Sequence, residues 1–266
     1  MKKLFFMIFL IFIFAGITLA QTGVKKKKPL PPEYGRVIMN NYSTRTGLAP
    51  VAFDHWLHRA KFTCRLCHVD IGFAMKAGAT GIRASDNIKG YYCGACHNGK
   101  TEYNGKIVFA ACAEDFTKKY PKTCDRCHSV GKIVEREHDF DKFAKNLPKE
   151  RFGNGIDWEK AEDEGHIKLI DFIEGISIKK PLLKRQEDFA IGSKVEGMPE
   201  IIFSHKKHTA WNGCEVCHPE IFVGVKKGIT KYSMVDIFQG SYCGVCHSTV
   251  AFPLMDCQRC HTKPVQ

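Results

Sequence analysis

Hydrophobic residues gather at one end of the chain. An apolar run from Leu4 to Ala20 follows "MKK" and precedes the polar stretch "QTGVKKKKP". This order predicts a secretory signal peptide over residues 1–20, with cleavage after Ala20, and therefore an exported protein of the periplasm or the cell exterior. The alternative is a retained N-terminal anchor, for which the run is at the short end of a membrane span. No other apolar stretch is long enough to cross a membrane.

The remaining chain carries short apolar runs separated by polar residues. Within 155–175, "GIDWEKAEDEGHIKLIDFIEG", acidic residues come first and apolar residues follow at mixed spacing. This pattern predicts one or two short helices, interrupted at Gly165, between the loop-forming stretches "RFGNG" and "KKPLLKRQ". We interpret residues 132–198, which contain no cysteine, as a packed connector with short helices.

The formal net charge of the chain is +12. A basic excess raises the question of a nucleic-acid or other anionic partner. Lys and Arg are scattered, however, and their one block, "KKKKPLPP" (25–32), is typical of a solvated tail within a basic N-terminal segment, residues 21–47. Because export also argues against nucleic acid, we expect no such partner.

The cysteine content of the chain requires a chemical explanation. The 266 residues include 13 Cys and 12 His, more than an ordinary core requires. Twelve of the cysteines fall into C-x-x-C-H motifs, of which about 0.03 are expected by chance from the residue frequencies. The six motifs are Cys64–Cys67–His68, Cys93–Cys96–His97, Cys124–Cys127–His128, Cys214–Cys217–His218, Cys243–Cys246–His247 and Cys257–Cys260–His261.

This spacing suits covalent attachment of c-type haem. Two thiols one helical turn apart can form thioethers to one edge of a porphyrin, and the adjacent His is directed under the ring as proximal iron ligand. Zinc ribbons and C-x-x-C redox pairs are the alternatives. Zinc would leave the six histidines without a role, and exposed thiols would oxidise outside the cytoplasm. We therefore expect six c-type haems, with all twelve cysteines as attachment residues and His68, His97, His128, His218, His247 and His261 as proximal ligands.

Six haems would have to share about 246 residues after signal cleavage, or about 41 residues each. So little chain cannot surround each porphyrin with a side-chain core of its own. We expect the haems to form much of the core, and the haem-free chain to be largely unfolded.

The motifs belong to an internal repeat. A shift of 150 residues aligns 51–97 with 201–247 without a gap, and 18 of these 47 positions are identical. His55 falls on His205, and His58 falls on His208. The first copy carries a 17-residue insertion between its second and third motifs. We interpret the chain as two triheme modules, module A (48–131) and module B (199–266).

Each module leaves three irons in need of a sixth ligand. At positions i and i+3, the paired histidines of "FDHWLH" (53–58) and "FSHKKH" (203–208) share one face of a short helix and can reach two neighbouring haems. One helix would then clamp two porphyrins together. The alternative is a pair of solvated surface histidines.

The pattern F-x-H-x-x-H-x5-C-x-x-C-H, followed by two further C-x-x-C-H motifs, resembles the cytochrome c7 branch of the cytochrome c3 family over residues 48–131 and 199–264. The resemblance implies a mainly irregular fold with short α-helices and a minimal β-hairpin, in which "VAF" (51–53) and "IIF" (201–203) would be strands. It also implies that the first His of each pair ligates the first haem and the second His the second haem. Carried over, His55 and His58 would serve the Cys64/Cys67 and Cys93/Cys96 haems, and His205 and His208 would serve the Cys214/Cys217 and Cys243/Cys246 haems.

In such proteins the third haem takes its distal ligand, His or sometimes Met, from the segment between the first two motifs. Module B offers Met234 there, which we expect to ligate the Cys257/Cys260 haem, although interior packing is the commoner use of Met. Module A has Ala84 at the aligned position. Its Cys124/Cys127 haem would take another ligand or stay open. The candidate ligands are Met75 and His138 as first choices, then His166 and the thirteenth cysteine, Cys112.

These features predict an electron-transfer protein and not an enzyme, because haems with both axial positions filled leave no room for a substrate. The resemblance implies a carrier in anaerobic respiration, between a membrane quinol-oxidising complex and a terminal reductase or outer-membrane cytochrome. The first alternative is a small-molecule reductase acting at an open third haem of module A. Others are a subunit of a membrane-anchored oxidoreductase complex, with membrane contact only if the N-terminal segment is retained, and an extracellular haem filament. The basic side chains would offset haem propionates, which predicts potentials that depend on pH and salt.

Overall fold

The computed structural model describes residues 28–112, 121–134, 138–179, 187–193, 196–224, 226–247 and 249–263. The predicted signal peptide, residues 1–20, lies outside these ranges. Over the described ranges, no helix combines the length and apolarity needed to span a bilayer. The chain divides into two units, Met1–Leu30 and Pro31–Gln266, and all elements described below belong to the second.

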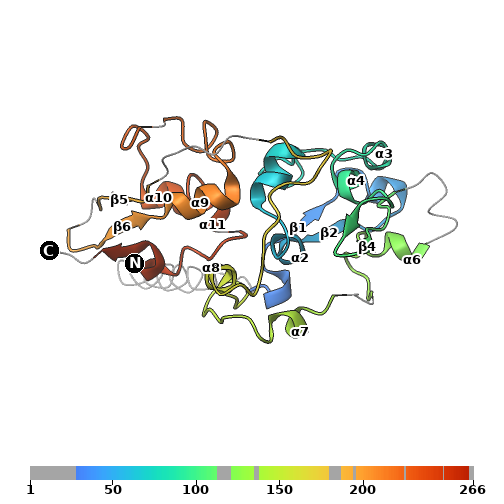
Figure 1. Cartoon of the computed structure of the whole chain (residues 1–266), viewed down its shortest axis with the longest axis horizontal. Helices are drawn as coiled ribbons and strands as arrows, with labels where there is room; N and C mark the ends of the chain where they lie inside the picture. The colour runs from blue at the N-terminus through green and yellow to red at the C-terminus, as the bar shows by residue number, and fades with distance from the viewer. Residues whose placement is uncertain are drawn as a thin grey trace, which may run out of the picture. The chain divides into compact units, whose positions relative to one another are not determined.

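Within the described ranges the helices are short (Figure 1). The longest of them, α9, has eight residues, whereas an isolated helix needs about 12–15 residues to be even marginally stable in water. Each helix therefore depends on what it packs against. The helices are α2 (His55–Arg59), α3 (Ala84–Ile88), α4 (Cys93–Cys96), α6 (Pro121–Cys124), α7 (Phe140–Ala144), α8 (Trp158–Asp163), α9 (His205–Asn212), α10 (Met234–Phe238), α11 (Gly244–His247) and α12 (Cys257–Cys260), with single helical turns at Pro31–Glu33, Thr44–Thr46 and Leu66–Asp70.

The strands of the described residues form three small sheets. Strands β1 (Arg36–Met39) and β2 (Val51–Asp54) make an antiparallel hairpin, and β3 (Glu102–Tyr103) pairs with β4 (Lys106–Ile107) between the second and third motifs of module A, in the stretch that contains the insertion. Strand β6 (Glu200–Phe203) is flanked by β5 (Phe189–Ile191) and β7 (His261–Lys263). The stretches "VAF" and "IIF" lie in β2 and β6. The prediction of a mainly irregular fold with short helices and minimal sheet is confirmed.

The sequence repeat has a structural counterpart at two glycines. Gly94 of α4 and Gly244 of α11 occupy aligned positions, each following the first cysteine of a motif. A Cβ atom on Gly94 would lie 1.9 Å from the carbonyl oxygen of Asn87, and one on Gly244 would lie 1.9 Å from that of Ile237. Only glycine therefore lets each attachment helix approach the helix before it, α3 or α10.

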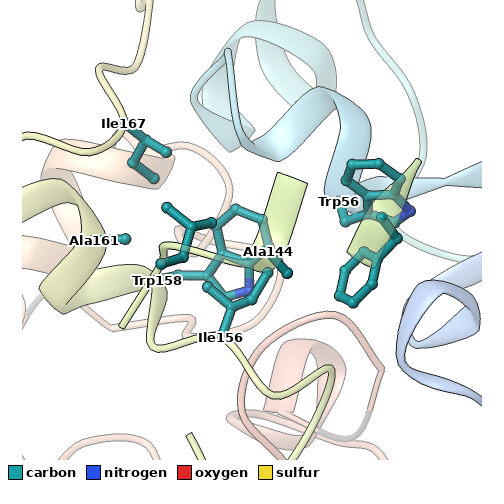
Figure 2. Close-up of a cluster of buried hydrophobic side chains, with 8 residues drawn as sticks. Trp56, Ala144, Ile156, Trp158, Ala161 and Ile167 are labelled. Carbon is teal, nitrogen blue, oxygen red and sulfur yellow. The ribbon is translucent and has the colours of Figure 1, made fainter. Parts of the chain in front are cut away.

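A cluster of buried side chains joins the connector to module A (Figure 2). Trp56 of α2 packs edge-on against Phe140 of α7, with ring centres 5.1 Å apart. In α8, the indole N–H of Trp158 donates to Asn154 at 3.1 Å. Since α2 carries the paired histidines of module A, the connector holds these histidines in place. The cluster comprises Trp56, Phe140, Ala144, Leu147, Ile156, Trp158, Ala161 and Ile167.

The connector also contacts module B through polar bonds. The indole N–H of Trp211, in α9, donates to Glu162 of α8 at 2.6 Å. Arg259, in α12, pairs with Asp157 at the start of α8 at 3.0 Å. Helix α8 ends at Asp163, and Gly165 follows with a φ of 76°, the position at which the sequence predicted an interruption. Both helices of the connector that the structure describes thus face a module.

Candidate haem-binding site

One continuous cavity of about 2630 Å³ runs through the second unit. Its volume is several times the roughly 300–1000 Å³ of a pocket for a single small ligand. Residues from all six C-x-x-C-H motifs line it, so the motifs surround a common space. The lining includes Cys64, Cys67, His68, Cys93, Cys96, His97, Cys127, Cys214, Cys217, His218, Cys243, Cys246, His247, Cys257, Cys260 and His261.

Two pairs of histidine rings face each other across this cavity. The ring centres of His58 and His97 are 6.2 Å apart, and those of His208 and His247 are 6.1 Å apart. A metal–imidazole bond is about 2.0–2.1 Å long, so two imidazoles on opposite sides of one metal have centres roughly 6 Å apart. The spacing of both pairs therefore suits a single iron between the two rings.

The first histidine of each pair begins its helix and lies near the other expected partner. His55, the first residue of α2, is within electrostatic range of His68. His205, the first residue of α9, is likewise within electrostatic range of His218. The structure thus places each of the four distal candidates near the motif histidine of the haem to which the family resemblance assigned it, and the ligand roles stay predictions.

The histidine rings are oriented by backbone carbonyls. Because a carbonyl oxygen only accepts, a ring Nδ1 bonded to it must carry the proton, which leaves Nε2 free for a metal. Seven of the ten predicted histidine ligands make this contact. The pairs are His55 with Gly35 (2.6 Å), His68 with Phe73 (2.9 Å), His128 with Ala49 (2.7 Å), His208 with Ser204 (2.9 Å), His218 with Phe222 (2.8 Å), His247 with Phe252 (3.1 Å) and His261 with Pro199 (2.7 Å).

The second proximal histidine of each module also packs against a phenylalanine ring, with the two rings inclined steeply to each other. The rings of His97 and Phe109 have centres 4.6 Å apart, and those of His247 and Phe252 are 4.3 Å apart. His97 Nδ1 faces the carbonyl of Phe109 without full hydrogen-bond geometry. Phe109 follows His97 by 12 residues and Phe252 follows His247 by five, so both lie in the part of the modules that differs in length.

Burial sets the protonation of these side chains. It lowers the pKa of His58 to about 3 and that of His247 to about 4, so both imidazoles are neutral near pH 7 and can bind a metal. Burial also raises the pKa of Cys67, Cys93 and Cys246 to about 12. Catalytic thiol–disulfide centres show the opposite shift, toward a stabilised thiolate. These three cysteines therefore do not have the electrostatic environment of a dithiol redox enzyme.

The third site differs between the modules. Met234 is the first residue of α10, lines the cavity and is 41% exposed. Ala84 is the first residue of α3, the helix that corresponds to α10. Module A thus keeps the helix and lacks the thioether at its start.

Two of the four substitutes for that thioether line the cavity. Met75 does so and is 39% exposed. His138 does so too, and desolvation together with nearby Lys61 and Arg126 lowers its pKa.

The other two substitutes have different surroundings. His166 lies in the connector, where its Nε2 is 3.3 Å from a carboxylate oxygen of Glu164. Cys112 lies within electrostatic range of Cys93 and Cys127, beside the attachment cysteines of the second and third motifs. The geometry does not single out one of the four.

Residues that the sequence interpretation missed support the second distal histidines. Phe53 stacks on His58 with ring centres 4.6 Å apart, and Phe203 stacks on His208 at 4.5 Å. Both are identical in the repeat and stand at the end of the strands that precede the paired histidines. The presence of phenylalanine at this position in both copies of the repeat was the sequence signal that could have indicated their contact with the histidines.

Comparison with known proteins follows the same division of the chain. A family model described as "Cytochrome c7 and related cytochrome c" matches residues 51–129 and 201–262, together more than half of the chain. Among solved structures, the chain is similar to the C-terminal hexaheme fragment of GSU1996, with 24% identity over 89% of this chain and 99% of that one and a TM-score of 0.27. It is also similar to a c7-type three-heme cytochrome domain, with 34% identity over 27% of this chain and 90% of that one and a TM-score of 0.25. No curated protein matches the chain.

Proposed function

Because the chain belongs to the cytochrome c7 family and is a multihaem c-type cytochrome, we propose that it transfers electrons through six covalently attached haems, three in each module. The observation that carries the proposal is the pairing of His58 with His97 and of His208 with His247, both near the spacing of two imidazoles on one metal.

In this proposal the twelve motif cysteines hold the haems by thioethers, and the six motif histidines are the proximal ligands. His55, His58, His205, His208 and Met234 are the distal ligands. When bound, each haem supplies one-electron exchange at its iron. Where two side chains hold an iron, a substrate would have no access to the metal. The carbonyl bonds of the histidines fix the ring orientations, so the ligand set changes little between oxidation states.

Location and partners extend the proposal. The apolar run at residues 4–20 and the family resemblance support an exported, periplasmic protein working in anaerobic respiration. Its donor would be a membrane quinol-oxidising complex and its acceptor a terminal reductase or outer-membrane cytochrome. N-terminal sequencing of the mature protein tests export: a start at Gln21 supports it. A start at Met1 would favour a membrane-anchored subunit of an oxidoreductase complex.

Two measurements on the purified holoprotein test the core of the proposal. The intact mass and the haem absorbance per polypeptide give the number of attached haems, for which we expect six. Carbon monoxide binding to the reduced protein, counted per chain, gives the number of open irons. Fewer than six haems, or an intact mass without covalent addition, would overturn the proposal.

A second function is favoured by one observation. Ala84 begins α3 where Met234 begins α10, so the third haem of module A lacks the ligand proposed for module B. If that iron is open, module A could reduce a small molecule there. One carbon monoxide per chain would support this reading. None would mean that another side chain completes the coordination and that the protein only carries electrons.

A further inference from the structure

The attachment residues of the two modules meet at one place. Cys64, which opens the first motif of module A, lies within electrostatic range of Cys217 and Cys246 of module B. The side chain of Arg65 also lies against the backbone of module B, since a Cβ atom on Gly213 would lie 2.6 Å from Cδ of Arg65. We call this region, around Cys64, Cys217 and Cys246, the module junction.

Arg59, the last residue of α2, lies at the module junction. Its Nη1 donates to the carbonyl oxygen of Val250 at 2.7 Å. Its guanidinium lies over the ring of Trp158, at 4.7 Å from the ring centre. Arg59 also lines the cavity, and Cys64 and Cys246 are among its strongest electrostatic neighbours.

The partners of Arg59 differ from those of the arginines around it. Arg65 pairs with Asp70 and Asp171, and Arg259 pairs with carboxylates of the connector. Among the residues that the structure describes, the contacts of Arg59 are a neutral carbonyl and aromatic rings. Haem attachment converts Cys64 and Cys246 into uncharged thioethers, so it adds no negative charge at the sulfurs. Arg59 thus brings a fixed positive charge to a partly buried place.

We propose that Arg59 raises the reduction potentials of the haems on Cys64/Cys67 and Cys243/Cys246, and so favours an electron at the module junction. The inference rests on the proposed function. The ferrous state carries one positive charge fewer than the ferric state, so a nearby cation stabilises it. A charge in a low-dielectric interior acts more strongly than one in water and is screened less by salt.

A redox titration of the holoprotein tests this, with each haem followed by its own NMR signals. In Arg59→Met, the two junction haems shift to lower potential relative to the wild type, while the other four change little. Arg59→Lys keeps the charge and restores most of the two potentials. Lys160→Met, which removes an exposed charge of the connector, leaves both potentials near the wild-type values. The shift between Arg59→Met and the wild type is the same at low and high salt.

Several results would overturn the inference. The first is that the two junction potentials do not shift in Arg59→Met, and the second is that all six potentials shift equally. The third is that the potentials of Arg59→Lys match those of Arg59→Met. The last would show that the guanidinium acts only through its bonds. If Arg59→Met does not accumulate, Arg59→Gln takes its place in the titration, because glutamine keeps a hydrogen-bond donor but carries no charge. The haem count of the wild type does not depend on Arg59. A count of six together with no shift in Arg59→Met would therefore overturn this inference alone, whereas a lower count would overturn the proposed function.

Discussion

The ring centres of His208 and His247 lie 6.1 Å apart, although the two residues belong to different helices, α9 and α11. The same relation holds between His58 and His97 in the other module at 6.2 Å. Each pair is formed by the second histidine of a short helix and the histidine of the second C-x-x-C-H motif. The repetition of one distance in two copies is the basis of the first prediction.

Replacing His208 by Ala should open one iron. We expect the affected haem to change from low-spin to high-spin in the ferric protein, and the reduced protein to bind one more carbon monoxide per chain than the wild type. The electron paramagnetic resonance spectrum and the Soret difference spectrum check this. Lys206→Ala is the matched control, because Lys206 is an exposed residue of the same helix, α9, and has no proposed role at an iron, so both spectra should stay unchanged.

Replacing Met234 by Ala should alter the third haem of module B. Loss of a Met–His pair should remove the near-infrared absorption of a sulfur-ligated ferric haem and lower one potential, because Met raises the potential of a haem that it ligates. Met255, which is 71% exposed, provides the control variant Met255→Ala. Unchanged near-infrared absorption in Met234→Ala would show that Met234 packs without binding iron.

Replacing Gly244 by Ala should destabilise the holoprotein. The added methyl would lie 1.9 Å from the carbonyl oxygen of Ile237, so α11 and α10 must separate. Inserting atoms into a packed contact costs about 1–3 kcal/mol. Gly192→Ala is the control, because its nearest neighbour would be a Glu200 side-chain oxygen at 3.7 Å. Denaturant unfolding monitored by circular dichroism compares the two, and equal midpoints would contradict the prediction.

Acid should weaken the attachment of α12 to the connector. Burial acts to raise the pKa of Asp157, but the backbone N–H of Lys160 and the guanidinium of Arg259 outweigh it and hold this pKa below its ordinary value of 3.8. A depressed carboxyl pKa stabilises the fold above the unfolded pKa, and the stabilisation is lost as the pH falls through the folded pKa. The difference in unfolding free energy between the wild type and Asp157→Asn should therefore be constant above about pH 5, and it should fall as the pH drops through the lowered pKa of the folded state. A difference that stays constant throughout the acid range would contradict this.

Haem-free protein should be largely unfolded. The cluster of buried side chains comprises eight residues and involves the connector and α2, whereas the cavity between the motifs measures about 2630 Å³. No helix among the described residues exceeds eight residues, so none is stable alone. Circular dichroism of protein made without haem attachment checks this expectation, and native helix content would contradict it.

The sequence was sufficient for those features that depend on local spacing. The helices beginning at His55 and His205 follow from the paired histidines and their repeat, and the strands containing Phe53 and Phe203 were implied by the resemblance to the cytochrome c7 family. Strand β7 was not predictable, because "HTK" has no alternating pattern and pairs with β6 only through a contact 60 residues away. Arg59 was missed for a similar reason: its environment is made by Val250 and Trp158, which are distant in the chain. The distal ligand of the third haem in module A stays a prediction, because the residue that aligns with Met234 is Ala84, which has no atom that can bind iron.

The spacing of Phe109 and Phe252 has a consequence for comparing sequences. Phe109 follows His97 by 12 residues and Phe252 follows His247 by five, yet each phenylalanine ring lies against the imidazole that precedes it. The contact is therefore kept although the intervening loop differs in length. Homologues should be compared by the residue that contacts this imidazole and not by its distance along the chain from the motif, since a fixed spacing would record the contact as missing.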